Sequence, residues 1–299
     1  MSLITIITPT YNRINRLPAL YESLKNQTCK DFEWFVVDDG STDGTCDYLE
    51  EISRENKISF KYITQSNGGK HRALNNGIRQ INTELTFIVD SDDVLPYNSI
   101  EIILRYHNKY KDYNDRCKPL CGYSFLRCHE DGRVNTAYFP KDELIDSFCN
   151  VRINGNIAGD KAEVFYTDIL KKYPFAEFEG EKFMPEDAVW MQMSSKYDMV
   201  HINENIYTCE YLEGGLTKTG RKMKINSPYG MMLRSETYLD EREVNLKTKL
   251  KMMLLLIIYS HFAACDNSKY KAKYGLGWYV CFLPASIIYL KWRKELENK

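Results

Sequence analysis

Three aspartates stand close together directly after an apolar stretch of the chain. Residues 87–95 read Phe-Ile-Val-Asp-Ser-Asp-Asp-Val-Leu, so an apolar run leads straight into Asp90, Asp92 and Asp93. Like charges at this spacing repel one another unless a cation neutralises them. Carboxylate oxygens suit Mg²⁺ or Mn²⁺, which commonly bridge such residues to substrate phosphates. The cluster suggests a metal–diphosphate site, and the alternative is a solvated turn that caps the next helix.

Four apolar runs of strand length precede or include this cluster, and each ends in a polar or glycine-rich turn. They are residues 2–8, 33–37, 60–64 and 85–89. The helical stretches between them are residues 14–26, 44–55 and 70–81. Strands that alternate with helices of this length indicate right-handed βαβ units and a parallel sheet. The four turns should therefore gather at one sheet edge, where a nucleotide would bind.

Four motifs occur in order within these turns. They are Thr-Pro-Thr-Tyr-Asn at 8–12, Val-Val-Asp-Asp-Gly-Ser-Thr-Asp at 36–43, Asn-Gly-Gly at 67–69 and Asp-Ser-Asp-Asp at 90–93. The ordered set resembles family 2 of the inverting glycosyltransferases, of the bacterial cell-surface polysaccharide type, which have the GT-A fold. The resemblance covers about residues 1–95 and extends more weakly to about residue 215. It implies sugar transfer from a nucleoside diphosphate donor with Mn²⁺ or Mg²⁺ bound at an Asp-x-Asp motif.

The resemblance also implies roles for residues of the first two turns. Those expected to line the nucleobase and ribose pocket are Thr8, Pro9, Tyr11 and Arg13. A tyrosine at a strand end can stack on a base, and an arginine can reach a phosphate. Asp39 matches the residue that accepts a hydrogen bond from uracil. The local alternatives are a stiff turn for residues 9–12 and a helix N-cap for the aspartates after the second strand.

Further donor-site residues follow the third and fourth strands. The resemblance assigns Gly69, Lys70 and Ser91 to donor binding, Asp90 to the ribose or the metal, and Asp92 to direct metal coordination. Glycine permits close approach of the backbone to a ligand, and a lysine can contact the donor. A left-handed turn with solvated basic residues is the alternative for Lys70. Residues 211–221, with two glycine clusters, suggest a mobile loop whose Lys218 would neutralise phosphate charge, or else a plain surface loop.

An acidic pair opens a predicted helix that runs from Pro185 to about Lys196. Family 2 enzymes carry such a pair here, and the resemblance makes Asp187 the general base and Glu186 a residue that orients it or binds the acceptor. An inverting mechanism needs one carboxylate to deprotonate the attacking hydroxyl. Proline and acids in a first helical turn are also ordinary capping chemistry.

The remaining sequence sets the expected organisation. We predict a catalytic domain over 1–226, with a nucleotide-binding half 1–95 and an acceptor half 96–226, and a helical appendage over 227–299. The apolar runs 251–265 and 278–292 are shorter than the ~20 residues of a membrane span, and Pro284 interrupts the second. They are expected to pack on the catalytic domain, form a homodimer or lie at a membrane surface.

Composition limits the partners and the compartment. The formal net charge of −1 gives no basic field for nucleic acid. The nine cysteines show no paired C-x-x-C spacing, so reduced thiols and a cytoplasmic location are expected, with contact at the inner membrane face as a variant. No signal peptide is apparent at the N-terminus.

Three function classes are compatible with these features. The expected one is a glycosyltransferase that uses a nucleotide sugar, foremost a UDP-sugar, and a glycan or lipid-linked glycan acceptor. A sugar-nucleotide pyrophosphorylase would share an α/β core and carboxylate-bound Mg²⁺, but it would begin with a glycine-rich basic loop where this chain has Thr-Pro-Thr-Tyr-Asn. The third is a non-catalytic scaffold that binds a nucleotide sugar.

Overall fold

The computed structural model describes residues 2–114, 118–135, 137–209 and 216–297, with only the backbone for 216–219. The chain folds into two compact units. Unit 1 comprises residues 1–175 and 196–211, and unit 2 comprises residues 176–195 and 212–299. The functional division expected between residues 226 and 227 stays a prediction.

Within its described residues, unit 1 is built on an eight-stranded sheet with the strand order β3-β2-β1-β4-β7-β5-β8-β6. The strands are β1 (Ile4–Thr10), β2 (Phe32–Asp38), β3 (Phe60–Thr64), β4 (Leu85–Ile88), β5 (Leu120–Cys128), β6 (Leu144–Asp146), β7 (Ala162–Tyr166) and β8 (Asp198–Thr208). Four of the seven strand pairings are parallel, namely β1–β2, β1–β4, β2–β3 and β5–β8. The predicted α/β fold with a mostly parallel sheet is confirmed.

The first half of unit 1 alternates strands with helices as the sequence predicts. The helices are α1 (Leu17–Lys25), α2 (Thr45–Glu55), α3 (Lys70–Arg79) and α4 (Ser99–Tyr110). One detail of the prediction is wrong: β1 continues through Pro9 and pairs with β2 up to Thr10. Pro9 is tolerated because its backbone nitrogen, which has no hydrogen to donate, faces β4. The pairing of β1 with β4 already ends at Ile7 and Ile88, so no hydrogen bond of the sheet is lost.

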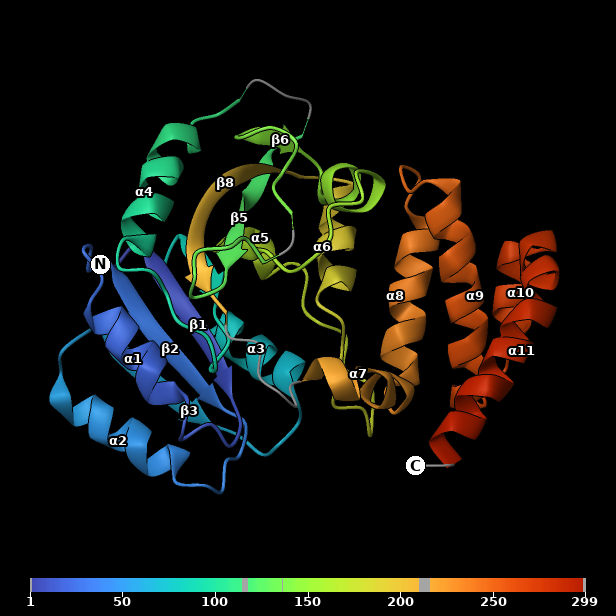
Figure 1. Cartoon of the computed structure of the whole chain (residues 1–299), viewed down its shortest axis with the longest axis horizontal. Helices are drawn as coiled ribbons and strands as arrows, with labels where there is room; N and C mark the ends of the chain where they lie inside the picture. Colours follow the sequence, from blue (N-terminus) through green and yellow to red (C-terminus); the bar gives the residue numbers. More distant parts are fainter. Residues whose placement is uncertain (1, 115–117, 136, 210–215, 298–299) are drawn as a thin grey trace. The chain divides into compact units, whose positions relative to one another are not determined.

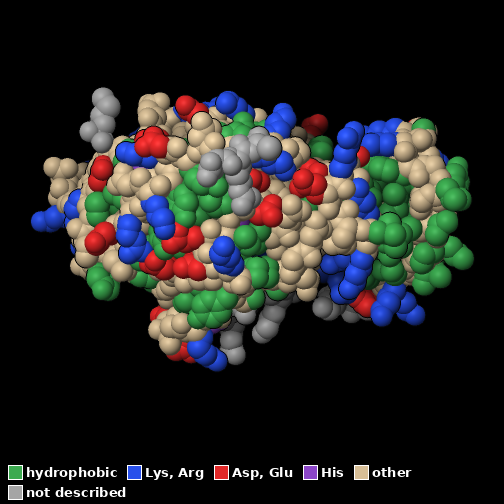
Figure 2. All heavy atoms as spheres, turned by 90° about the horizontal axis from the view of Figure 1, so that it is seen from above, with side chains coloured by type: hydrophobic (Ala, Val, Ile, Leu, Met, Phe, Trp, Pro, Cys, Tyr) green, Lys and Arg blue, Asp and Glu red, His purple; other side chains and the backbone are tan. Residues whose placement is uncertain are grey.

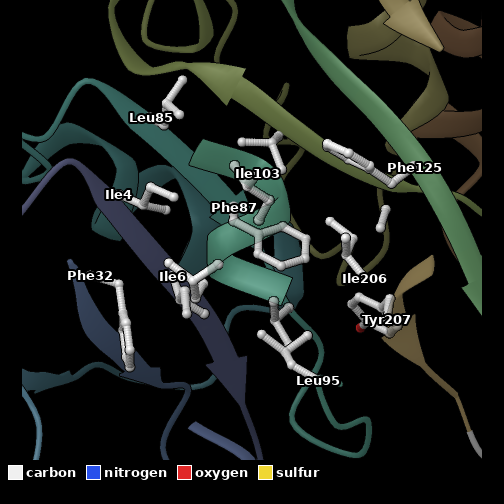
Figure 3. Close-up of a cluster of buried hydrophobic side chains, with 14 of the residues drawn as sticks. Ile4, Ile6, Phe32, Leu85, Phe87, Leu95, Ile103, Phe125, Ile206 and Tyr207 are labelled. Carbon is white, nitrogen blue, oxygen red and sulfur yellow. The ribbon is translucent and has the colours of Figure 1, made fainter. Parts of the chain in front are cut away.

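The two faces of this sheet are covered by different helices. Apolar residues of α1 and α4 pack with Ile6, Trp34 and Phe87 in one buried cluster, part of which Figure 3 shows. Helix α3 covers the opposite face, where a Cβ added to Gly77 would lie 2.5 Å from Ile7 and 2.8 Å from Val37. Figure 1 shows α1 on one side of β1 and β2 and α3 on the other. This burial fixes the strand ends that carry the site.

The second half of unit 1 was predicted less well. The sequence predicts a strand at residues 160–166 and a short helix at 167–172, and the strand β7 and the helix α5 (Thr167–Leu170) match them closely. The sequence predicts a strand at residues 206–210, but β8 begins eight residues earlier, at Asp198, because its first residues pair with β5 and β6. A π-helical turn, η1 (Cys149–Asn154), follows β6.

The regular secondary structure of unit 2 is helical throughout its described residues. Its helices are α6 (Asp187–Ser194), α7 (Leu216–Ile225), α8 (Pro228–Asp240), α9 (Leu246–Ala263), α10 (Ser268–Tyr274) and α11 (Leu276–Glu297). Two predictions need correction. The loop expected through residue 221 is helical from Leu216 onward, while residues 211–215 lie outside the described part. Pro284 does not interrupt its segment, since α11 runs through it.

A central cluster of unit 2 joins α8, α9 and α11. Met231 and Met232 of α8 pack with Leu256 and Ile257 of α9 and with Trp278 of α11, and all five are buried. Within the part of the chain that the structure describes, none of the helices combines the length and apolar composition that a membrane crossing requires.

Candidate active site

The carboxyl ends of β1, β2, β3 and β4 lie at one sheet edge because these strands are parallel neighbours. The turns after β1 and β2 are joined by hydrogen bonds. The Asn12 N–H donates to Ser41 Oγ, and the Thr42 N–H donates to Asn12 Oδ1, each at 2.8 Å. The Arg13 N–H donates to Thr45 Oγ1 at 3.2 Å. The edge is therefore a connected surface, as the motif spacing predicts.

The residues expected around the nucleobase differ in their exposure. Thr8 is fully buried, and its Oγ1 accepts a hydrogen bond from Trp34 Nε1 at 3.0 Å. Pro9 is also buried. Tyr11 has 46% of its surface exposed at the strand end, so its ring can stack on a flat ligand. Thr8 and Pro9 thus support the edge from within, and Tyr11 faces outward.

Asp39 is buried and tied to the loop between β3 and α3. Its carboxylate accepts hydrogen bonds from Gln65 Nε2 (2.8 Å), Asn67 Nδ2 (3.2 Å) and the N–H groups of Gly68 (2.9 Å) and Gly69 (2.7 Å). Two carboxylate oxygens have about four acceptor positions in total. The loop fills this capacity, so a nucleobase would have to displace one of these donors. The role of Asp39 in binding uracil stays a prediction.

The aspartates after β4 are paired with basic side chains. Asp90 forms ion pairs with Lys70 of α3 and, at 3.8 Å, with Arg127 of β5. Asp92 lies 3.5 Å from Arg13 Nη2. The side chains of Asp90 and Asp92 are 28% and 29% exposed, so a ligand can reach both. Four of the residues singled out from the sequence as donor or metal ligands are thus brought together.

Two residues of this cluster were not predicted from the sequence. The Tyr207 hydroxyl accepts a hydrogen bond from the Asp90 N–H (2.9 Å) and donates one to Asp93 Oδ2 (2.8 Å). The Arg127 guanidinium lies 4.0 Å from the centre of the Tyr207 ring, and its Nε donates to the Lys161 carbonyl at 2.8 Å. Arg127 lies in β5 and Tyr207 in β8, and neither residue belongs to a sequence motif that would identify it as part of a site.

The surroundings of Asp90 and Asp93 shift the pKa values of their carboxyl groups in opposite directions. Burial raises the pKa of Asp90, but the charges of Lys70 and Arg127 lower it by more, and the net pKa lies below the usual range. Burial and the charge of Asp90 raise the pKa of Asp93 to about 7, against the hydrogen bond from Tyr207. Asp90 is therefore the stronger anion, and Asp93 supports it from the interior.

Two of the remaining donor-site predictions, Gly69 and Ser91, also lie in the turns at this edge. Gly69 precedes α3 with φ of 96°, a conformation that favours glycine. Ser91, which stands between Asp90 and Asp92 in the sequence, is buried. Lys218 lies in α7, and its side chain is outside the described residues.

A divalent cation fits the chemistry of this edge in part. Asp90 and Asp92 offer hard carboxylate oxygens, as Mg²⁺ and Mn²⁺ require. No group of three His, Cys, Asp or Glu side chains is placed to hold an ion anywhere in the described chain. The two carboxylates suit an ion that takes its other ligands from phosphate oxygens and water, which is how Mg²⁺ is commonly held.

Asp187 begins α6 in unit 2 and is held by α8. Arg234 Nε lies 2.8 Å from each of its carboxylate oxygens, and Arg234 Nη2 lies 2.5 Å from Oδ2. The Tyr238 hydroxyl donates to Oδ2 at 2.7 Å. Burial raises the pKa of Asp187, but Arg234 and Tyr238 lower it by more, so the net pKa is below the usual range. The side chain is 28% exposed, so an ionised carboxylate is accessible there.

Two further acids flank this position. Glu186 is the half-buried residue just before α6, and its side chain makes no capping hydrogen bond to the helix. Glu181 was not predicted: it is buried, and its carboxylate accepts from the N–H groups of Tyr229 (2.7 Å) and Gly230 (2.9 Å) at the start of α8. This placement holds α8 against the segment that leads to Asp187.

The strand order, the parallel βαβ half and the aspartates after β4 define a nucleotide-sugar transferase fold of the GT-A type. Residues 5–148 match the model of the family described as Glycosyl transferase family 2. The chain therefore carries a glycosyltransferase family 2 domain, and the resemblance seen in its motifs is confirmed.

Relatives agree with this assignment. An uncharacterized glycosyltransferase of Rickettsia bellii is 29% identical over 46% of this chain and 20% of its own length. Glycosyltransferase GlyG of Streptococcus pneumoniae is 26% identical over 73% of each chain. The GalNAc(5)-diNAcBac-PP-undecaprenol beta-1,3-glucosyltransferase of Campylobacter jejuni is 25% identical over 69% of this chain and 65% of its own. The chain thus spans about a fifth of the Rickettsia relative and most of GlyG.

Solved structures share the fold. Staphylococcus aureus TarS 1–349 in complex with UDP-GlcNAc has a TM-score of 0.62 at 20% identity, over 98% of this chain and 81% of that one. The mannosyltransferase PcManGT of Pyrobaculum calidifontis, in complex with GDP-Man and Mn²⁺, has a TM-score of 0.58 at 17% identity, over 99% and 81%.

Proposed function

We propose that the protein transfers a sugar from a nucleoside diphosphate donor, foremost a UDP-sugar, to a hydroxyl of a glycan or lipid-linked glycan. One observation carries the proposal: Asp90 and Asp92 lie partly exposed after β4, with Lys70 and Arg13 beside them. Carboxylates that take part in metal binding and cations that can pair with phosphate are the two kinds of group that a diphosphate requires. The UDP-GlcNAc complex of TarS, which shares the fold, supports a UDP-sugar as the donor.

Residues of unit 1 would bind and orient the donor. The exposed ring of Tyr11 would stack on the base, and Lys70 and Arg13 would exchange their aspartate partners for phosphate oxygens. Asp90 and Asp92 would hold Mn²⁺ or Mg²⁺, which stabilises negative charge on a leaving diphosphate when it is bound. Arg127 and Tyr207 would keep Asp90 ionised and in place.

Asp187 would act as the general base of an inverting reaction. Among the contacts of the described residues, Oδ2 accepts from Arg234 and Tyr238, whereas Oδ1 accepts from Arg234 Nε alone. Oδ1 therefore has the greater free acceptor capacity and would take the proton of the attacking hydroxyl. Glu186, beside it in the chain, would bind or orient the acceptor.

The nature of the acceptor rests on the relatives. The Campylobacter jejuni protein is, by its name, a glucosyltransferase for a glycan on undecaprenyl diphosphate. A lipid-linked glycan of polysaccharide biosynthesis is accordingly the proposed acceptor class. The reaction breaks the bond between the anomeric carbon and the diphosphate oxygen and forms a glycosidic bond at that carbon. The acceptor proton passes to Asp187, and the nucleoside diphosphate leaves.

The test is release of UDP from UDP-GlcNAc with Mn²⁺, compared with the same mixture in chelator. Asp92→Asn should reduce release by about 10² or more, because it removes a ligand of the ion. Asp240→Asn is the matched control, since Asp240 is also a partly exposed aspartate paired with a basic side chain, Lys273, but lies at the end of α8 in unit 2 and in none of the turns that carry the site. Equal activity of Asp92→Asn and Asp240→Asn would reject the metal assignment. Formation of UTP on adding pyrophosphate would identify a pyrophosphorylase instead, and a product with the donor's anomeric configuration would reject inversion.

A further inference from the structure

Helix α11 carries apolar residues on two opposite faces. The inner face, with Trp278, Cys281 and Ala285, is at most 5% exposed and packs in the cluster of unit 2. The outer face carries six large apolar residues that are each 60 to 78% exposed, namely Leu276, Tyr279, Val280, Leu283, Ile287 and Leu290. We call these six residues the α11 stripe.

The spacing of the α11 stripe makes it continuous. Its members follow one another at intervals of three, one, three, four and three residues, which places them along one line on an α-helix. From Leu276 to Leu290 this line is about 21 Å long at 1.5 Å per residue. Figure 2 shows hydrophobic side chains grouped over the C-terminal helices, with Lys and Arg side chains at the border of the group.

A continuous apolar stripe on a surface indicates an interaction site. Single exposed apolar residues are normal on a protein surface, but contiguous groups of them mark such sites. The core of unit 2 does not cover the stripe, because α11 packs on α9 through its opposite face. The stripe is therefore additional apolar surface.

The charges around the stripe indicate an anionic partner. Lys291 and Lys294 continue the line of the stripe toward the helix end, and neither has an ion pair among the described residues. Residues 268–297 contain six Lys or Arg and two acidic residues, Glu295 and Glu297, which are paired with Arg221 and Arg293 respectively. A second copy of the chain would bring the same lysines to a symmetric contact, so charge favours a different partner.

We propose that the α11 stripe docks on an anionic membrane surface, with its apolar side chains in the headgroup–acyl boundary and Lys291 and Lys294 on lipid phosphates. Tyr279 suits this depth, since tyrosine is enriched at membrane interfaces. Lysines near the surface add attraction to acidic lipid headgroups. The surface contact is independent of the chemistry proposed for the sheet edge, and it would hold even for a chain with no transferase activity.

The test is co-sedimentation of the full chain with vesicles of equal parts phosphatidylglycerol and phosphatidylcholine, and with vesicles of phosphatidylcholine alone. The double substitution Leu283→Ser with Ile287→Ser should weaken binding to the mixed vesicles by about tenfold or more, since it removes two apolar side chains from the contact. Leu246→Ser is the matched control, because Leu246 is 73% exposed on α9 and outside the stripe. It should leave binding unchanged.

The lysines are tested separately. Lys291→Ala with Lys294→Ala should weaken binding to the mixed vesicles by about tenfold and leave the weaker binding to phosphatidylcholine unaltered. Unchanged circular dichroism and melting temperature should accompany all these variants, since the altered side chains are exposed. Failure of the unaltered chain to sediment with phosphatidylglycerol vesicles would overturn the proposal. So would a dimer in analytical ultracentrifugation that the double stripe variant converts to a monomer without any change in vesicle binding.

Discussion

Arg234 of α8 contacts both carboxylate oxygens of Asp187 at the first turn of α6, with its Nε 2.8 Å from each. An arginine that holds a carboxylate in this way restricts its rotation and keeps it ionised. The same pairing reduces its basicity, since the pKa of Asp187 is lowered. Arg234 would thus be a positioning residue for the proposed base, and α8 would contribute to catalysis without touching substrate.

Asp187→Asn should bind donor and Mn²⁺ but lose turnover by about 10²–10⁴, the usual contribution of a positioned proton acceptor. Asparagine keeps the size of the side chain and cannot take the proton. Transfer rate and thermal stabilisation by UDP-GlcNAc would be measured side by side. Asp168→Asn provides the control, as Asp168 also lies in the first turn of a helix, α5, and is exposed. Retained turnover would move the role of base to Glu186 or elsewhere.

Arg234→Met should shift the acidic limb of the pH profile of kcat to higher pH. Arg234 is the main group that lowers the pKa of Asp187, and Tyr238 and Lys224 contribute in the same direction. Without Arg234 the pKa rises, so the carboxylate becomes protonated, and unable to accept a proton, at a higher pH. Tyr238→Phe should produce a smaller shift of the same sign. A lower rate with an unmoved profile in Arg234→Met would mean that Arg234 is only structural.

The parts of this fold that sequence predicts are those with a local signal. Each strand from β1 to β4 is a short apolar run that ends in a turn, and each intervening helix is amphipathic, so both the elements and their shared edge follow from patterning. Strand β8 lacks that signal, because His201, Asn203 and Glu204 interrupt its apolar residues. Its position depends on pairing with β5 and β6, which a local window does not contain.

The residues of the candidate site also fall into those that local sequence motifs predict and those that they do not. Asp90, Asp92 and Lys70 follow strands or begin a helix, so their motifs place them at the edge. Arg127 and Tyr207 are separated from Asp90 by 37 and 117 residues of sequence and meet it only through the sheet order. Likewise, no spacing rule connects Asp187 to Arg234, 47 residues later.

Asp39→Ala should destabilise unit 1 by about 1–3 kcal/mol, because it leaves the partly buried donors of Gln65 and of the Gly68 and Gly69 backbone without their acceptor. The loop that leads into α3 would lose its anchor, and donor affinity should fall with stability. Urea unfolding and UDP binding would report the two effects. Asp47→Ala, at an exposed position in the first turn of α2, should change both by far less. A variant that loses UDP binding at unchanged stability would instead support direct contact between Asp39 and the base.

His201 should make the fold sensitive to acid. It is fully buried on β8, its Nε2 lies 3.3 Å from the Asp146 carbonyl, and its Nδ1 has no partner among the described residues. Burial lowers the pKa of His201 to about 3, whereas an unfolded histidine has a pKa near 6.5. The unfolded chain therefore binds a proton that the folded chain does not, between about pH 6.5 and pH 3. Stability contributed by neutral His201 is fully present above that window and falls by about 1.4 kcal/mol for each pH unit within it.

His201→Gln removes this titration, so the loss of unfolding free energy between about pH 6 and pH 4 should shrink by about 2–3 kcal/mol relative to the unaltered chain. Urea denaturation at a series of pH values measures the slope. His129→Gln is the comparison variant, because His129 is only half-buried and follows the end of β5. Equal slopes in His201→Gln and the unaltered chain would show that His201 becomes protonated in the folded state, as it could if β6 separates from β8 and admits water to the ring.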